Sequence, residues 1–202
     1  MARLTRAFFA RPALEVAPEL LGCRLIHDGA GGRTEGVVVE VEAYLGDGSD
    51  PASHAHSGPT SRNASMFGPP GRFYVYRSMG LHACANLVCE PEGRGAGVLL
   101  RAVEPTAGQE RMARRRGGRS GAELANGPGK LTQAFGIRLE HDGHSALSGR
   151  LRVESASAPP AAIASGPRIG IRRAADLPYR FCIADHPGVS RSPLNRRLRP
   201  YA

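Results

Sequence analysis

The stretch Val37-Val38-Val39-Glu40-Val41-Glu42-Ala43-Tyr44 decides the fold. Its β-branched residues predict a central strand, whose side chains alternate between two faces. Strict alternation puts Val37, Val39, Val41, Ala43 and Leu45 on an apolar face, and Val38, Glu40, Glu42 and Tyr44 on the opposite face. Two carboxylates and a phenol on one strand face are costly unless they meet cations or line a cleft. Both interpretations stay open at this point: ion pairs with arginines, or a functional site.

The charge balance predicts an anionic partner. The chain has 202 residues and a net charge of +9, and its basic residues are arginines except for Lys130. Such a surface favours nucleic acid first and an anionic membrane second. The length suits a single domain over residues 1–202. We expect a frayed basic tail over residues 192–202.

The four cysteines argue against a disulfide or zinc framework. Cys23, Cys84, Cys89 and Cys182 include no Cys-x-x-Cys pair, so we expect reduced, buried thiols. We find no signal peptide and no apolar run of membrane length, which predicts a soluble cytoplasmic protein.

Hydrophobic periodicity and turn residues predict the other elements. Helices are expected over residues 12–21, over 106–116 with Thr106 as N-cap, and from Pro128 to Gly136. Strands are expected over residues 23–27, 71–77, 81–88, 98–103, 151–153, 168–171 and 179–184, with a spacer over 155–167. The first of these strands forms a hairpin with residues 37–42, and the second and third form a hairpin with Met79 near its tip.

Two polar segments have candidate functions. The loop over residues 46–70 is long and nearly free of apolar residues, which favours a functional loop. Asp50, His54 and His56 within it are an alternative metal site, although their spacing matches no metal motif. The arginine run over residues 114–119 is predicted to be mobile and solvated, and it is a candidate phosphate contact.

Motifs along nearly the whole chain resemble one family. They are Val39-Glu40-Val41-Glu42-Ala43-Tyr44-Leu45-Gly46, Ser53-His54-Ala55, Arg62-Asn63, Met66-Phe67, Phe73-Tyr74-Val75-Tyr76, Leu99-Leu100-Arg101-Ala102-Val103-Glu104-Pro105, Gly127-Pro128-Gly129-Lys130-Leu131, Arg168-Ile169-Gly170-Ile171 and Val189-Ser190-Arg191. In this order and spacing the chain resembles the alkyladenine DNA glycosylases, the mammalian-type 3-methyladenine DNA glycosylases with many bacterial members. The resemblance implies an α+β single domain around a curved, mostly antiparallel sheet with flanking helices and no helix-hairpin-helix.

The resemblance also implies the site residues and the partner, damaged double-stranded DNA. Glu42 matches the catalytic general base and Arg101 the arginine near the water and the phosphate. Tyr44 and Tyr76 match the aromatics that sandwich the flipped base, His54 (with His56 as a rival) the histidine that contacts it, and Asn86 the asparagine that screens purines at the 2-position. Met79 matches the intercalating wedge, which is a tyrosine in vertebrate members. Contacts with the water or a phosphate are implied for Val189, Lys130 and Arg62.

The implied reaction is hydrolysis of the N-glycosidic bond of an alkylated or deaminated purine. We expect a monomer that acts at the bacterial nucleoid without a cofactor or metal. Bifunctional glycosylases attack with an amine, and Lys130 is the only lysine, so we predict a monofunctional enzyme. The alternatives are a non-catalytic lesion-binding protein on the same fold, and a metal-dependent hydrolase that chelators would inactivate.

Overall fold

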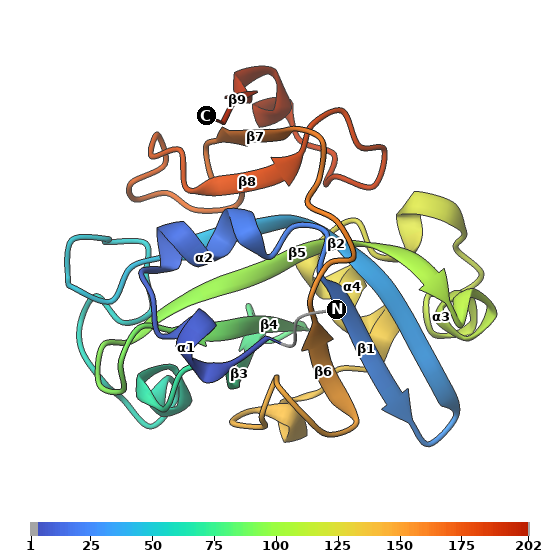
Figure 1. Ribbon diagram of the computed structural model, residues 1–202, viewed down its shortest axis with the longest axis horizontal. Coiled ribbons are helices and arrows are strands. Elements are labelled where there is room, and N and C mark those ends of the chain that lie inside the picture. The colour runs from blue at the N-terminus through green and yellow to red at the C-terminus, as the bar shows by residue number, and fades with distance from the viewer. Residues whose placement is uncertain (1–3, 202) are drawn as a thin grey trace.

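Strand β2 (Gly32–Tyr44) is the centre of a curved antiparallel sheet (Figure 1). The structure is a computed structural model that describes residues 4–201. Strand β5 (Ala96–Ala107) pairs with β2 along one side. On the other side, β1 (Arg24–Gly29) pairs with the first half of β2, and β8 (Arg180–Ile183) with the second half. The sheet therefore forks along β2.

The remaining elements extend this sheet or cover it. The strands run in the order β3-β4-β5-β2-β8-β7-β9, with β6 paired to β1. Their bounds are β3 (Phe73–Ser78), β4 (His82–Cys89), β6 (Leu151–Glu154), β7 (Ile163–Gly166) and β9 (Arg199–Pro200). The helices are α1 (Arg6–Phe9), α2 (Ala13–Glu19), α3 (Gln109–Arg115) and α4 (Pro128–Phe135), with 3₁₀ turns η1 (Ala64–Phe67), η2 (Gly121–Leu124), η3 (Leu139–His141) and η4 (Pro193–Arg197).

A bulge in β2 makes the predicted strict alternation wrong. The register with β5 shifts on both sides of Glu40, and Val39 has no partner in β5. Val38 belongs to the hydrophobic core, although strict alternation assigned it to the polar face. Val41 and Ala43 are core residues as predicted, whereas Val37 is only half-buried. One extra residue shifts the alternation of side chains between the two faces of a strand. A single alternation therefore cannot describe the residues before and after the bulge.

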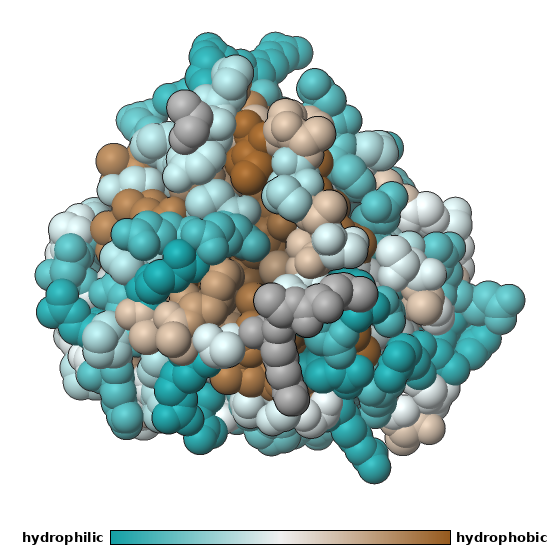
Figure 2. All heavy atoms as spheres, viewed as in Figure 1, coloured by the Kyte–Doolittle hydropathy of each residue, from teal (hydrophilic) through white to brown (hydrophobic). Residues whose placement is uncertain are grey.

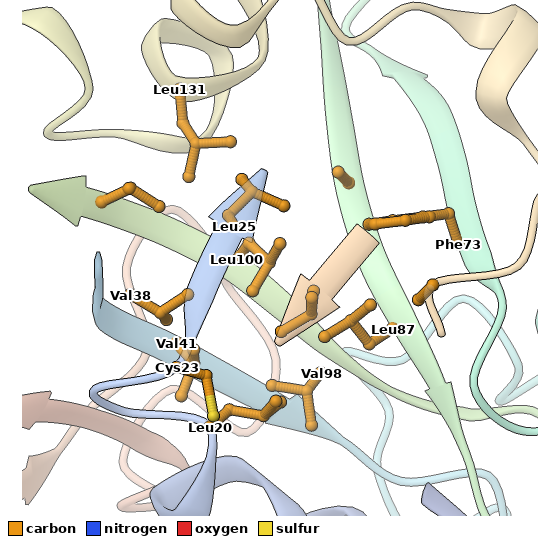
Figure 3. Packing of buried hydrophobic residues seen from close by; sticks show 14 of the residues in the cluster. Leu20, Cys23, Leu25, Val38, Val41, Phe73, Leu87, Val98, Leu100 and Leu131 are labelled. Carbon is orange, nitrogen blue, oxygen red and sulfur yellow. The ribbon is translucent and has the colours of Figure 1, made fainter. Parts of the chain in front are cut away.

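The core lies between the sheet and the helices. Figure 3 shows Val41, Val98 and Leu100 from the sheet between Leu131 of α4 and Leu20 at the end of α2. All five side chains have an exposed fraction of 0%. The predicted helix ending at Gly136 is confirmed, because this glycine takes the left-handed conformation that terminates the helix.

The predicted hairpins are confirmed, but one helix boundary is wrong. Strands β3 and β4 pair directly around a tight turn, and so do β1 and β2. The helix expected from Thr106 instead begins at Gln109, because β5 continues to Ala107. Gly108 separates the end of β5 from the start of α3. Its φ is 74°, and a Cβ there would lie 2.3 Å from the carbonyl oxygen of Arg33. Close packing against β2 thus sets the helix start.

The C-terminal region differs most from the prediction. Residues 168–171 form no strand, while β7 lies within the predicted spacer. The tail over residues 192–201 is not frayed: β9 pairs with β7, and Asn195 accepts a hydrogen bond from the buried Arg180 and donates one to Ser190. The backbone N–H of Ile169 donates to Oε1 of Glu42, so it is not available for a strand ladder.

The cysteines lie in the interior, and hydrophobic and hydrophilic residues share the surface. All four cysteines are free and buried, as predicted. Figure 2 shows hydrophobic residues in the middle of one face and hydrophilic residues around its edge. No helix within residues 4–201 has the length and apolar content needed to cross a bilayer.

Candidate active site

Six of the predicted site residues line one small cavity. It has a volume of about 280 Å³, and we call it the tyrosine cavity. The predicted residues in its wall are Tyr44, His54, Arg62, Tyr76, Met79 and Asn86; the others are Ala52, Met66, Tyr74, Ser78, Gly170 and Ile171. The wall combines the end of β2, the polar loop, the β3–β4 hairpin and the segment after β7. The loop over residues 46–70 therefore contributes to the candidate site.

Glu42 lies directly behind this wall and is fully buried. Its Oε1 accepts a hydrogen bond from the backbone N–H of Ile169 at 2.6 Å. Its Oε2 accepts one from the Tyr44 hydroxyl at 2.9 Å and lies 3.3 Å from Nη1 of Arg101. Tyr44 lines the cavity and Glu42 does not, so the Tyr44 hydroxyl links the carboxylate to the cavity wall. Burial, followed by the charge of Glu42, raises the pKa of Tyr44 well above its ordinary value.

Arg101 joins two buried carboxylates. Its Nε lies 3.5 Å from Oε1 of Glu40, in addition to the contact with Glu42. Burial opposes its charge, but Glu42 and Glu40 together raise the pKa of Arg101. Glu40 also accepts hydrogen bonds from Nη1 of Arg180 at 3.0 Å and from the N–H of Ser190 at 2.9 Å. We call Glu40, Glu42, Arg101 and Arg180 the buried ionic layer.

A second buried ion pair supports Tyr44. Arg168 binds both carboxylate oxygens of Asp50, at 2.6 and 2.7 Å, and both side chains are fully buried. The guanidinium carbon of Arg168 lies 4.6 Å from the ring centroid of Tyr44. Such cation–π contacts restrain an aromatic ring. Asp50 also accepts hydrogen bonds from the N–H groups of Leu45 and Ala52, so the same carboxylate anchors the polar loop.

Three further rings line the cavity, those of Tyr74, Tyr76 and His54. Tyr74 and Tyr76 stack, with centroids 5.4 Å apart, because alternate residues of β3 share a face. His54 meets the ring of Tyr76 edge to face at 4.5 Å, and its Nδ1 lies 2.9 Å from the Tyr74 hydroxyl. Burial and the charge of Arg62 lower the pKa of His54, which favours the neutral ring. Burial raises the pKa of Tyr74 to about 12.

The structure distinguishes between the two candidate histidines. Both side chains are exposed, but His54 lines the tyrosine cavity, whereas His56 lies outside its lining and donates from Nδ1 to the carbonyl of Gly48 at 3.0 Å. Neither shares a metal site with Asp50, because Asp50 is held by Arg168. Within the described residues, no group of three or more His, Cys, Asp or Glu side chains could hold a metal ion.

Asn86 and Met79 occupy opposite ends of the β3–β4 hairpin. Asn86 is 5% exposed and donates from Nδ2 to the carbonyl of Tyr74 at 3.1 Å, which fixes its amide at the cavity. Met79 is 90% exposed and has a φ of 50°, a strained value for a long side chain. Leu81, which sequence reasoning did not single out, is 73% exposed beside it. Met79, Gly80 and Leu81 form what we call the hairpin tip.

Three other predicted contacts lie apart from the carboxylate. Arg62 is in the cavity wall and donates to the carbonyl of Arg77 at 3.1 Å. Lys130 is exposed at the start of α4 and donates to Oδ1 of Asn126 at 2.9 Å. Val189 lines a different cavity, beside β7 and β8. The structure therefore does not bring Val189 or Lys130 into the tyrosine cavity.

Comparison with known proteins identifies the family. A family model described as methylpurine-DNA glycosylase matches residues 7–187. This chain belongs to the methylpurine-DNA glycosylase family. The family resemblance seen in the sequence is confirmed, and the protein is a monofunctional DNA glycosylase that acts on DNA containing damaged bases.

Relatives from several bacteria match this methylpurine-DNA glycosylase over most of their length. A Rhodopseudomonas palustris protein is 51% identical over 182 residues, which cover 90% of this chain and 85% of the relative. A Burkholderia lata protein is 49% identical over 199 residues, covering 96% and 93% of the two chains. A Nitrosospira multiformis protein is 46% identical over 183 residues, covering 91% of each. All three carry the name "Putative 3-methyladenine DNA glycosylase".

Two buried ion pairs behind the cavity were not found by sequence reasoning. Arg168 and Asp50 are 118 positions apart, and Arg180 and Glu40 are 140 apart. A sequence with 27 basic residues offers many partners for each acid. No local signal selects these pairs. Leu81 had a weak signal, since it is an apolar residue that follows the glycine of a hairpin turn.

Proposed function

We propose that this enzyme turns alkylated or deaminated purines out of duplex DNA into the tyrosine cavity. Its substrates are of the 3-methyladenine, 7-methylguanine, hypoxanthine and ethenoadenine type. Water activated by Glu42 hydrolyses the N-glycosidic bond and leaves an abasic site. One observation carries the proposal: the Tyr44 phenol both lines the cavity and donates to Glu42, so base and carboxylate would be separated by one hydrogen-bonded group.

Search and base flipping use the surface. The net charge of +9 supplies a salt-sensitive attraction to phosphates along the chromosome, in the cytoplasm. Apolar side chains that enter a base step unstack it and kink the duplex. The exposed Met79 and Leu81 at the hairpin tip are suited to this role, and Arg62 and Lys130 to nearby phosphates.

Recognition of the flipped base uses the aromatic walls. Tyr44 and Tyr76 would stack on its two faces, and a cationic alkylated ring would bind more strongly than a neutral one. Asn86 is held by Tyr74 at the cavity wall, where it would exclude purines with a 2-amino group. His54 would contact an edge of the base. The small volume suits one base rather than a base pair.

The chemical step uses the buried ionic layer. Water bound to Glu42 would attack C1′ of the deoxyribose and lose its proton to the carboxylate, while the C1′–N bonding electrons leave with the base. The Tyr44 hydroxyl donates a hydrogen bond to Oε2 of Glu42. We infer that it fills the position of the attacking water until the base enters. Arg101 stabilises the ionised carboxylate, whose charge in turn stabilises the oxocarbenium-like sugar.

The leaving groups differ in their need for a proton. A 3-methylated adenine is already cationic and departs without one. A neutral lesion such as hypoxanthine must be protonated as it leaves. Solvent or the protonated form of His54 would donate that proton, because His54 is the titratable imidazole in the cavity wall.

The test is the Glu42→Gln variant, assayed on oligonucleotides that each carry one defined lesion. We expect single-turnover excision, read by alkaline cleavage, to fall about 10³-fold, because the amide cannot take the proton of the water. Binding of lesion DNA should stay within a few-fold of wild type. The matched control is Glu104→Gln, at an exposed carboxylate of β5. Normal excision by Glu42→Gln would reject Glu42 as the base.

A further inference from the structure

The largest described cavity lies away from the proposed catalytic site. It has a volume of about 810 Å³ and shares no lining residue with the tyrosine cavity. Its wall combines the β1–β2 turn, the end of α4 and the segment from Arg138 to Leu151. We call it the histidine–arginine cavity, after its titratable lining: His27, His141, His144, Arg72, Arg115, Arg138, Arg150 and Glu140.

Position separates this cavity from the hairpin tip. Arg72 immediately precedes β3 and Met79 immediately follows it, so an extended strand puts about 23 Å between them. Helix α4 spans the same direction: Gly129 near its start packs against His82 beside the tip, while Gly136 at its end lines the cavity. The histidine–arginine cavity is therefore separate from the hairpin tip and from the tyrosine cavity.

The charges in this cavity are unbalanced. Four arginines and one glutamate line it, and within residues 4–201 none of the four guanidinium groups forms an ion pair. The crowding has an effect: burial and then the charges of Arg111, Arg138 and Arg114 lower the pKa of Arg115. An anion would relieve this repulsion between cations.

Two of the arginines have structural roles and two do not. Arg72 donates to the carbonyl of Gly143 at 2.7 Å, and Arg115 donates to that of Ala134 at 2.9 Å at the end of α4. The exposed side chains of Arg138 and Arg150 make no hydrogen bond or ion pair with residues 4–201. They are available to a ligand without any change in the fold.

The three histidines of the wall are in ring contact in series. His27 is buried, and its Nδ1 donates to the carbonyl of Phe135 at 2.7 Å. His141 packs edge to face on both His27 and His144, with centroids 5.0 and 5.7 Å away. Its Nδ1 lies 3.0 Å from the backbone nitrogen and 3.2 Å from the carbonyl oxygen of Arg138. In the tautomer in which Nδ1 accepts from that N–H, Nε2 carries the proton and is a donor. Guanidinium groups, which form bidentate hydrogen bonds, and imidazole N–H donors together fit the several oxygens of a phosphate group.

We propose that the histidine–arginine cavity binds a compact oligophosphate anion, such as pyrophosphate or the phosphate chain of a nucleotide. Its volume falls within the usual range for small-molecule sites. Its concave shape suits a small ligand better than the convex backbone of a duplex. Arg138 and Arg150 bind the phosphate oxygens, and the imidazole N–H of His141 donates to them.

The test compares two double variants with the same change in charge. Arg138→Glu/Arg150→Glu reverses the two unpaired cations of the cavity. Arg6→Glu/Arg196→Glu is the control, at exposed arginines outside it. Calorimetric titration with inorganic pyrophosphate should give saturable binding to wild type and control. The cavity variant should lose about tenfold or more in affinity, equivalent to about 1.4 kcal/mol. The histidine ring signals of His141 and His144 should shift as wild type is titrated.

Further arms identify the phosphate source. A nucleoside triphosphate should bind wild type and compete with pyrophosphate, while affinity for an undamaged duplex should be the same in both double variants. The proposal is overturned if wild type does not bind pyrophosphate, or if both double variants lose it equally. It is also overturned if undamaged duplex displaces pyrophosphate and the cavity variant loses more duplex affinity than the control, since the cavity would then belong to the DNA surface.

Discussion

The buried ionic layer and the hairpin tip are opposite in character, although both adjoin the tyrosine cavity. Glu40, Glu42 and Arg180 have an exposed fraction of 0%, and each carboxylate oxygen is bound. Met79 and Leu81 are the most exposed large apolar residues within residues 4–201. Charges that act on a reaction must be held in place before the substrate arrives. A wedge finds its packing partner only in the DNA stack, so it must remain uncovered.

The largest effect should follow from breaking the buried layer. Arg180→Met leaves Glu40 without its closest guanidinium, and we expect unfolding free energy to fall by about 3–5 kcal/mol in urea titrations. The double variant Glu40→Leu/Arg180→Met should recover much of that loss, because no unpaired charge remains. The control Arg11→Ala, in an exposed pair with Glu19, should cost under about 1 kcal/mol. Equal losses in Arg180→Met and the control would contradict the comparison.

The next effect separates the ring of Tyr44 from its hydroxyl. Tyr44→Ala removes the stacking wall, and lesion-DNA binding should weaken by about 1–3 kcal/mol, as for other base–aromatic stacks. Tyr44→Phe keeps the ring over Arg168 and frees Oε2 of Glu42 for water. Its binding and single-turnover excision should stay within a few-fold of wild type. If Phe proves as damaging as Ala, the hydroxyl rather than the ring matters.

A smaller effect is expected at the hairpin tip. Met79→Ala/Leu81→Ala should change stability by less than about 0.5 kcal/mol per site, because neither side chain is packed. Excision from duplex should fall about tenfold, since unstacking a base step costs a few kcal/mol. Excision from the same lesion in single-stranded DNA should be unchanged. Leu139→Ala, at another exposed apolar residue, is the control. Equal losses on both substrates would exclude a wedge role.

The smallest effect concerns pH. The pKa of His54 is lowered in the folded protein, so the unfolded chain binds more protons below the ordinary histidine pKa of about 6.5. Stability therefore decreases as pH falls through that value toward the lowered pKa. Urea titrations at several pH values should show a steeper decrease for wild type than for His54→Gln. Parallel curves would mean that the environment of His54 does not disfavour its charge.

Local sequence patterns were enough to predict the second half of β2 and the hairpin that carries Tyr74 and Tyr76. Alternation predicted that Glu40, Glu42 and Tyr44 share a face, because a regular strand has a period of two. The same rule failed at Val38, where a bulge changes the phase. Whether a strand takes an extra residue depends on its neighbours, here β1 and β8 meeting along one side of β2.

By itself the sequence determined the family, the charge, the central strand and which residue types could do the chemistry. These properties reside in short motifs and in composition. Only the tertiary structure decided that Arg101 lies between Glu40 and Glu42, that His54 rather than His56 faces the cavity, and that Arg168 supports the ring of Tyr44. Such pairings form between segments far apart in the chain. They depend on how the whole sheet curves and which charges it buries, and no local pattern encodes that.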